Sequence, residues 1–409
     1  MRSPGMTPPE LPSQLQSRGS SQGGLRQYNE RVVLQAIRLH GAVPAAELAR
    51  LTHLTAQTIS LISKRLQEDG LLLKGEPVRG KVGQPSVPLS LNPEGAFAIG
   101  IKVGRRNLEV LLVDFTGQPR QRWSLGYEAA DPDVVVPEIA LRLREIRRKL
   151  GPGRRERLEG IGVAAPLAMH SWQSLLGASP ELARKWEGFD LAGAVARNTL
   201  LPVSTIKDTA AACVAELVLG RGRSVRNFLY VFVDTFVGGS LVLDSHLRLG
   251  LHGNAGAFGS LPLGRAGTGG PPAQLLSQAS LVRLEQRFLA AGLDGNAALD
   301  ERALQAPWLA HTEPWLAEAA EAIALGMHMA ACLLDIEAAI LDGAMGRGLL
   351  AQLAARVQQA FGDLDWSGVS PPQLLTGTVG SDAMALGGAM MPLYANYAPD
   401  RELFLKDEP

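Results

Sequence analysis

Apolar residues recur at the spacing of an amphipathic helix in the first part of the chain. The first such segment covers about residues 28–41 and places Val33 and Ile37 on one face. The second covers about residues 44–52, and Pro44 fits just inside its first turn because the N–H that proline lacks would have no helical partner there. The pattern predicts two short helices joined by a short loop.

A third amphipathic segment follows, from an N-cap at Thr55 to a closing glycine at position 70. Its apolar side is formed by Ile59, Ile62 and Leu66. Two short helices followed by a helix of this kind are typical of a helix-turn-helix, whose last helix reads DNA bases. The side chains predicted to contact DNA are polar groups that can bond base edges or phosphates: Thr55, Gln57, Thr58, Ser60, Lys64 and Arg65.

Two short strands, at about residues 71–73 and 87–91, enclose a glycine-containing loop at 79–85. The loop is a candidate wing, because glycines let the backbone approach a groove wall and basic side chains bind phosphates. Its predicted DNA-contacting residues are Arg79, Lys81 and Gln84. Between residues 25 and 92 the basic excess is modest, nine Lys or Arg against five Asp or Glu. A small domain that binds another protein therefore stays open as an alternative.

The remainder of the chain shows a different pattern, in which short apolar strands alternate with helix-like stretches. Strands are predicted at 98–103 and 108–114, followed by a turn at Gly117, and later at 160–164 and 228–233. Alternation of strands and helices favours the α/β fold class.

The composition limits the number and kind of these units but does not indicate a function. The 409 residues exceed one domain of about 150 residues, and the 40 basic and 40 acidic residues cancel, so no global field attracts nucleic acid or a membrane. Residues 1–24 are rich in Ser, Pro, Gly and Gln and predict a disordered tail without a secretion signal. No uninterrupted apolar run reaches the roughly 18 residues of a membrane span. Because Cys213 and Cys332 also lie far apart, we expect a cytoplasmic protein without a disulfide framework.

Four segments occur in an order that a known family shares. The loop and strand at 83–93 are similar to a wing and its exit strand, and 160–166 to a strand and turn that lead into a sugar pocket. Residues 186–191 and 207–216 are similar to a tryptophan-containing stretch and to an Asn-Asp-Ala-Asn helix start. With these segments the chain resembles the ROK family (repressor, open reading frame, kinase) from about residue 28 to 393.

The resemblance implies an α/β protein in which an N-terminal winged helix-turn-helix precedes a two-lobed, actin-like or sugar-kinase-like (ribonuclease H-like) ATPase fold. The DNA-binding domain would cover residues 25–92 and the first α/β lobe 93–205, completed by about 375–400. The second lobe would cover 206–374. Residues 377–389 resemble the family's closing helix, which packs back on the first lobe.

The resemblance also implies a sugar pocket. Asp208 stands where the family's kinases carry the base that takes a proton from the sugar hydroxyl, although an aspartate at a helix start is commonly an N-cap. A small polyol needs several convergent hydrogen bonds. The residues expected to supply them are Asp208 and Asn254 first, and then Gly256, Ser260, Pro166 and Glu181.

The same resemblance implies that the chain lacks the residues that the family's kinases use for phosphoryl transfer. Residues 102–106 replace the family's Asp-x-Gly-Gly-Thr loop, and Phe236 puts a ring where a second glycine-rich loop would approach phosphate. Ala257 and Ser260 replace a sugar-binding glutamate and a histidine that also binds zinc. The cysteine knot expected at 264–272 has no cysteine, so the sequence predicts no zinc, no other metal and no cofactor.

These observations predict a non-enzymatic transcription regulator, and more specifically a repressor of carbohydrate-metabolism genes. Its partners would be a double-stranded DNA operator and a sugar or sugar-derivative effector. Helix-turn-helix regulators commonly pair to match operator half-sites, so a homodimer or homotetramer is expected. Two alternatives remain: an ATP-dependent sugar kinase with an appended N-terminal domain, and a protein that binds a partner regulator instead of DNA.

Overall fold

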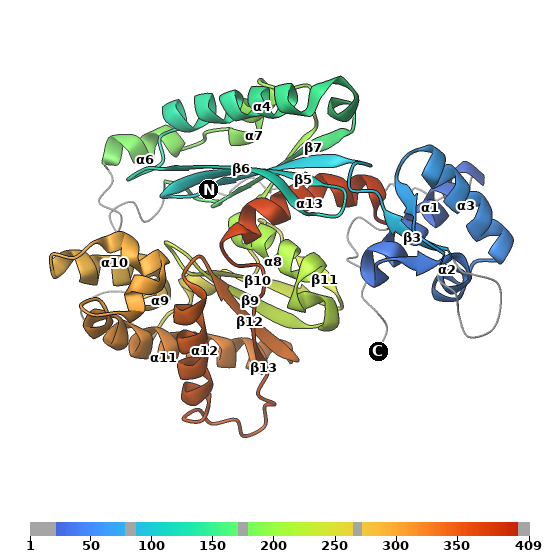
Figure 1. Ribbon diagram of the computed structural model, residues 1–409. Helices are drawn as coiled ribbons and strands as arrows, with labels where there is room; N and C mark the ends of the chain where they lie inside the picture. The colour runs from blue at the N-terminus through green and yellow to red at the C-terminus, as the bar shows by residue number, and fades with distance from the viewer. Residues whose placement is uncertain (1–21, 78–86, 171–178, 265–271, 400–409) are drawn as a thin grey trace, which may run out of the picture.

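The computed structural model describes residues 22–77, 87–170, 179–264 and 272–399. Its N-terminal unit packs helices against an antiparallel sheet of order β1-β3-β2. Figure 1 shows this unit in blue beside the two-lobed remainder of the chain. Its elements are α1 (Gln22–His40), β1 (Val43–Pro44), α2 (Ala45–Thr52), α3 (Ala56–Glu68), β2 (Leu72–Lys74) and β3 (Pro88–Leu91).

The predicted order of three helices and two strands is present, with two differences near its start. α1 begins at Gln22, inside the segment 1–24 predicted as a tail, because its exposed first turns need no apolar residues once the later turns are packed. Pro44 precedes α2 instead of lying inside it, since it pairs with Pro88 in the β1–β3 ladder. The candidate wing residues Arg79, Lys81 and Gln84 lie outside the described residues.

A five-stranded sheet of order β6-β5-β4-β7-β8 forms the first lobe. Its first three strands are an antiparallel meander, and β7 and β8 run parallel to β4. α4 and α7 cover one face of the sheet and α13 (Ala383–Tyr397) covers the other (Figure 1), so β4 is buried along its whole length. The lobe's elements are β4 (Phe97–Val103), β5 (Asn107–Asp114), β6 (Pro119–Gly126), α4 (Pro132–Arg155), β7 (Leu158–Ala165), α6 (Pro180–Trp186), α7 (Leu191–Ala196) and β8 (Val203–Lys207).

The second lobe repeats this order in its sheet, β11-β10-β9-β12-β13, again with an antiparallel meander followed by two parallel strands. The repeated arrangement confirms the predicted two-lobed α/β fold. The further helical and strand elements are α8 (Asp208–Leu219), η1 (Arg221–Ser224), β9 (Phe228–Val233), β10 (Gly238–Leu243), β11 (His246–Arg248), η2 (Phe258–Ser260), α9 (Leu276–Ala279), α10 (Leu281–Ala290), η3 (Gly295–Leu299), η4 (Glu301–Leu304), α11 (Leu309–Leu334), β12 (Ala338–Gly343), α12 (Arg347–Phe361), β13 (Gln373–Thr376) and η5 (Gly380–Asp382).

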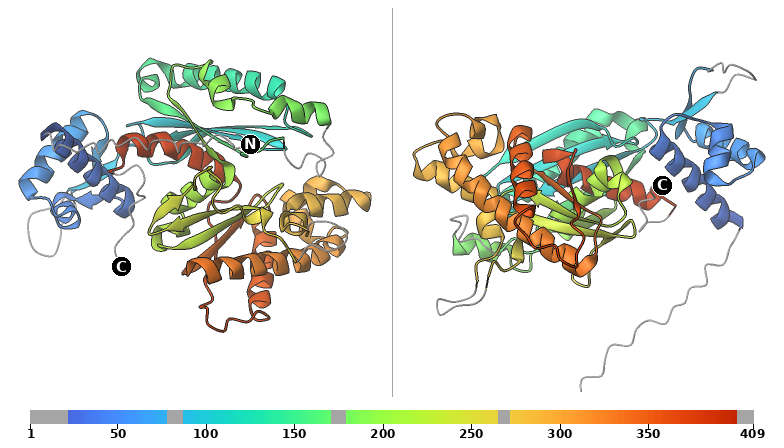
Figure 2. Two further views of the ribbon diagram at one scale, coloured as in Figure 1. Left: turned by 180° about the vertical axis from the view of Figure 1, so that it is seen from behind. Right: turned by 90° about the horizontal axis from the view of Figure 1, so that it is seen from below.

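α8 and α13 cross between the two sheets at contacts that require glycine (Figures 1 and 2). A Cβ atom on Gly387 of α13 would lie 1.7 Å from the carbonyl oxygen of Ala211 in α8. A Cβ atom on Gly100 of β4 would lie 1.8 Å from a backbone oxygen of α13, and one on Gly162 of β7 would lie 1.9 Å from another. The C-terminal helix therefore meets the first lobe and α8 backbone to backbone, which is the packing that the resemblance implied.

One helix of the second lobe bears on membrane segments, although Glu318 and Glu321 interrupt its apolar run. Among the described residues, α11 is long and apolar enough to cross a membrane by length and composition alone. It packs Trp315, Leu316, Ile323 and Met327 into the core of the second lobe, where their apolar surface is removed from water.

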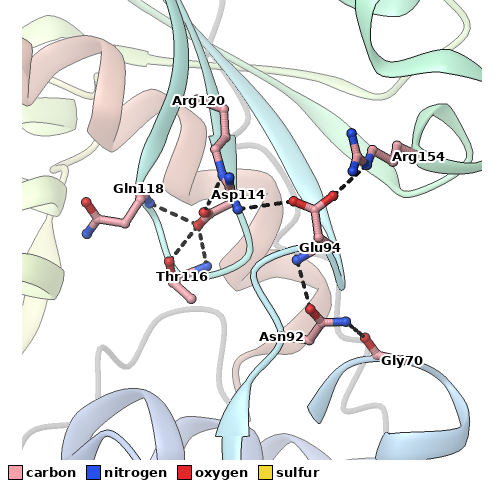
Figure 3. A network of polar contacts seen from close by, with 8 residues as sticks. All are labelled: Gly70, Asn92, Glu94, Asp114, Thr116, Gln118, Arg120 and Arg154. Carbon is pink, nitrogen blue, oxygen red and sulfur yellow. Dashed lines mark hydrogen bonds and ion pairs between the residues drawn. The ribbon is translucent and has the colours of Figure 1, made fainter. Parts of the chain in front are cut away.

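A polar network joins the N-terminal unit to the first lobe where the chain passes from β3 to β4 (Figure 3). Asn92 donates from Nδ2 to the Gly70 carbonyl oxygen of the N-terminal unit at 2.7 Å. The Glu94 carboxylate pairs with Arg120 at 3.1 Å and with Arg154 at 2.6 Å. Arg120 Nε donates in turn to the buried Asp114 carboxylate at 2.7 Å. The connecting segment is thus bonded on both sides.

The glycine contact predicts the effect of a single added methyl group. Alanine in place of Gly387 gains about 1 kcal/mol in helix propensity, but its Cβ collides with Ala211, and overpacking costs about 1–3 kcal/mol or more. We expect Gly387→Ala to lower the urea midpoint and the melting temperature. Gly126→Ala is the control, since a Cβ there meets no heavy atom within 4 Å. Equal midpoints for the two variants would contradict the close contact.

Candidate functional site

The first candidate site is the exposed face of α3. Its N-cap is as predicted, because the Thr55 hydroxyl accepts a hydrogen bond from the Thr58 backbone N–H at 3.2 Å. The predicted apolar side is buried, namely Ile59, Ile62 and Leu66. Gln57, Ser60, Lys64 and Arg65 are exposed and Thr58 is half-buried, so α3 presents a polar surface to solvent.

The charged groups of α3 are held by ion pairs on its surface. Lys64 lies 3.8 Å from Glu68, and Arg65 lies 3.4 Å from Glu30 of α1. The exposed Lys64–Glu68 pair contributes little, about 0–1 kcal/mol, so a phosphate can replace Glu68 at little cost, whereas Glu30 is only 16% exposed and holds Arg65 more firmly. The sequence reasoning missed Leu61, whose side chain is 66% exposed in the middle of this face and which can contact a thymine methyl group.

The second candidate site is a cavity of about 130 Å³ between the lobes. The loop after β7, the start of α8 and the loops around β10 and η2 all contribute to its lining. Four of the residues predicted to bind an effector line it: Pro166, Asp208, Asn254 and Ser260.

Two of the predicted residues do not line this cavity. Gly256 has φ +71°, and a Cβ on it would lie 2.7 Å from Ser240 Cα, so its role in the structure is to bring its loop against β10. Glu181 is exposed in the first turn of α6, away from the cavity lining. The sequence placed it near the pocket through a resemblance, whereas its side chain follows the solvent side of a seven-residue helix.

Asp208 is the first residue of α8, and its carboxylate accepts a hydrogen bond from the Thr209 N–H at 2.7 Å. The N-cap position belongs to Lys207, so Asp208 does not serve as a simple N-cap. Burial raises the pKa of Asp208, although the Thr209 N–H and the charges of Lys207 and Arg105 oppose that shift. A buried carboxyl group with a raised pKa and no capping role is a candidate for ligand contact.

Lys207 and Arg105 also line the cavity and were not among the predicted ligands. Lys207 Nζ donates to the Gly239 carbonyl across the cleft at 3.1 Å, and burial lowers its pKa. The signal for Lys207 was present in the sequence, because it replaces the first asparagine of the family's Asn-Asp-Ala-Asn start.

Arg105 fills the place of the lost phosphate loop. Its guanidinium donates to the carbonyl oxygens of Ala168 at 3.0 Å and Met169 at 3.2 Å. Its central carbon lies 4.9 Å from the centre of the Phe236 ring, which comes from the other lobe. Burial lowers the pKa of Arg105 to about 10, against the opposing charge of Asp208. The arginine thus ties together segments of both lobes beside the cavity.

Lys102 replaces the acidic residue of the first phosphate loop and forms a buried ion pair between the lobes. Its side chain is 2% exposed, with Nζ 3.1 Å from Asp234 and 3.6 Å from Glu109. Burial by itself lowers the pKa of Lys102, but the charges of Asp234 and Glu109 outweigh this and raise it. A larger cavity of about 700 Å³ lies beside the pair, where Arg106 bonds Glu285 at 3.0 Å.

No group of three His, Cys, Asp or Glu side chains that could hold a metal ion occurs in the part of the chain that the structure describes. Most of the segment that would carry the cysteine knot, 265–271, lies outside that part. The prediction that the protein binds no zinc therefore stays a prediction.

The raised pKa of Asp208 predicts a pH-dependent stability difference. Above the ordinary aspartate pKa of about 3.9, the folded state holds a proton that the unfolded state releases, so this group makes the protein less stable as pH rises through that window. We expect Asp208→Asn to melt at a higher temperature than the wild type at pH 7, with the difference vanishing below about pH 4. The exposed Asp363→Asn is the control. A variant no more stable at pH 7 would show that burial does not penalise this carboxylate.

Comparisons with known proteins agree with these features. The chain is 23% identical over 239 residues to a putative xylose repressor of Caldicellulosiruptor sp. (strain Rt8B.4), covering 58% of this chain and 59% of that protein. It is 25% identical over 228 residues to the DNA-binding transcriptional repressor Mlc of Escherichia coli (strain K12), covering 54% of this chain and 55% of that protein. The matched region is thus less than two thirds of each relative's length.

Solved structures share the fold. A ROK family transcriptional regulator, a homolog of the E. coli MLC protein, superposes with a TM-score of 0.65 at 20% identity, over 91% of this chain and 98% of that chain. A ROK glucokinase from Streptomyces griseus in complex with glucose and AMPPNP superposes with a TM-score of 0.58 at 20% identity, over 72% of this chain and 99% of that chain. The family model described as ROK matches residues 98–392. The chain therefore belongs to the ROK family.

Proposed function

We propose that this protein is a DNA-binding repressor of carbohydrate-metabolism genes, whose DNA affinity is set by a sugar or sugar derivative bound between the lobes. The observation that carries the proposal is the exposed polar face of α3. The unit that contains α3 is bonded to a kinase-like body, in which Lys102 and Arg105 occupy the segment that resembles a phosphate loop. Relatives that carry the names xylose repressor and transcriptional repressor Mlc support it.

The DNA-contacting surface of this proposal consists of α3 and the wing. Lys64 and Arg65 supply positive charge for phosphates, while Gln57 and Ser60 offer groups that bond base edges. The wing residues Arg79, Lys81 and Gln84 complete the surface. Such regulators pair to match operator half-sites, so the proposal includes a homodimer or homotetramer that acts in the cytoplasm.

The effector would be a neutral or weakly charged polyol. Asp208, Asn254 and Ser260 offer hydrogen-bonding groups to the cavity. The charged groups that line it balance in number, with Arg105 and Lys207 beside Asp208 and Asp234. A polyol bonded by several such groups needs no metal or cofactor, so the proposal includes neither.

A sugar kinase is the competing function, since solved ROK structures include a glucokinase. Against it stands the chemistry of the phosphate loops. Phosphoryl transfer needs backbone N–H groups and a metal held against phosphates. Here Lys102 is neutralised by Asp234 and Glu109, and the Arg105–Phe236 stack lies where the phosphate loops would meet. We therefore propose that the protein is not an enzyme.

The DNA-binding half is tested by selection of operator sequences from a random pool of duplexes. We expect one sequence class to be enriched, and Lys64→Ala to weaken binding to it and to reduce the slope of log K against log salt by about 1. Arg283→Ala is the control, because it removes the same charge from an exposed position on α10 of the second lobe. If no sequence is enriched, the protein does not read DNA; binding to a partner regulator would then be the better account.

The effector half is tested with D-xylose and D-glucose in a melting assay and in an assay for ADP release from ATP and Mg²⁺. We expect a bound sugar to raise the melting temperature, since at 100 times its Kd a ligand adds about 2.7 kcal/mol of stability. Asn254→Ala should reduce that shift. No ADP release is expected. Release with either sugar, abolished by Asp208→Asn, would establish the kinase and refute the proposed function.

A further inference from the structure

We propose that α8 couples the effector cavity to the DNA-binding unit, and that the contact of Arg223 with the end of α1 delivers the change. The inference rests on the proposed function, because it requires an effector in the cavity and an operator on α3. The cavity lies at the start of this buried helix, and its other end leads through η1 to α1, which supports α3. Three observations support this assignment: contacts at the cavity end of α8, the rigid packing along it, and a bond at its far end.

The cavity end of α8 is bonded to β10 beside the cavity. Asp208 and Thr209, its first two residues, both line the cavity. Thr209 Oγ1 donates to the Gly239 carbonyl of β10 at 3.1 Å, and Lys207 Nζ donates to the same oxygen at 3.1 Å. A ligand that bonds Asp208 or opens the cleft must therefore act on the first turn of α8.

The length of α8 is packed so that it moves as one body. Its 12 residues span about 18 Å, and every side chain from Thr209 to Val218 is buried. The buried Glu216 carboxylate accepts bonds from the Arg221 N–H at 2.7 Å and from the Thr378 N–H at 3.1 Å. These bonds join the end of α8 to η1 and to the segment before α13. Close-packed elements shift between arrangements and do not bend continuously.

The far end of α8 reaches the DNA-binding unit through η1. Arg223 Nη2 donates to the carbonyl oxygen of Leu39 in the last turn of α1. That carbonyl is one of those which have no partner within the helix, and a cation at a helix C-terminus is favourable. α1 in turn contacts α3, for example through Glu30 and Arg65 at 3.4 Å. A shift of Arg223 thus acts on the helix that supports the DNA-contacting face.

The same end of α1 is held by the first lobe. Arg38 Nη1 donates to the Phe115 carbonyl at 2.9 Å, and its guanidinium carbon lies 5.1 Å from the Phe115 ring centre. The network at Asn92 and Glu94 fixes the connecting segment on that side (Figure 3). α1 is bonded both to the first lobe and to η1, which follows α8. A displacement of α8 relative to the first lobe would therefore change the orientation of α1.

The decisive variant is Arg223→Ala, with Arg226→Ala as the control. Arg226 is exposed three residues further on, and no side-chain bond from it occurs among the described residues. Operator affinity is measured by anisotropy with the selected duplex, with and without D-xylose or D-glucose, and sugar binding by melting. In the wild type and in Arg226→Ala, the sugar should change operator Kd by a factor in the range of about 5–150.

In Arg223→Ala the melting shift with sugar should be unchanged, while the sugar changes operator Kd by less than about twofold. Retention of the wild-type factor would overturn the coupling through α8 and leave the proposed function intact. Loss of the melting shift together with the factor would also overturn it, because Arg223 would then act on the cavity itself. If no duplex is selected, the proposed function fails, and the coupling fails with it.

A second measurement needs no sugar. Operator Kd is compared for Asp208→Asn, Arg223→Ala and the double variant, with Thr209→Val replacing Asp208→Asn if the latter does not fold. Residues this far apart usually act additively to within about twofold. The coupling predicts that the cavity substitution changes operator Kd in the wild-type background and much less in the Arg223→Ala background. Additive effects, or no effect of the cavity substitution, would overturn it.

Discussion

The structure depends on one crossing of two helices without side chains between them. At Gly387 the backbone of α13 rests on the Ala211 carbonyl of α8, and at Gly100 and Gly162 the same helix rests on the strands of the first sheet. Backbone contact at this spacing leaves no room for an added side chain, because no flexible group separates the elements. The two lobes therefore meet through these two helices, on which the position of the cavity between the lobes depends.

The second constraint is electrostatic and lies between the two lobes. Lys102 is buried between Asp234 and Glu109, and Arg105 stacks on Phe236 while bonding the loop after β7. Charges removed from water must be paired, so these cations and their partners join segments of the two lobes beside the small polar cavity.

Local features of the fold could be predicted from the sequence. The Thr55 cap and the buried stripe of Ile59, Ile62 and Leu66 depend on residues a few positions apart. The partner of Lys102 could not be predicted in this way, because Asp234 lies in another lobe and only the folded chain brings the two together. Glu181 was expected at the cavity because of a resemblance in the order of motifs. Such a resemblance does not determine the direction of a side chain on a short helix.

Asp208 and Asn254 line the cavity and follow the family's motifs, so the sequence could identify them. Lys207 follows the same motif and could have been identified in the same way. Arg105 could not, since its contacts with Ala168 and Phe236 join three separate segments.

The ion pair at Lys102 also bears on how this chain can change over evolutionary time. A return to aspartate at position 102 would remove the cation that Asp234 and Glu109 share and place a third carboxylate beside them. Substitution at position 102 is thus tied to both partners, because a neutral or acidic side chain there would leave buried carboxylates without a cation unless Asp234 and Glu109 changed with it.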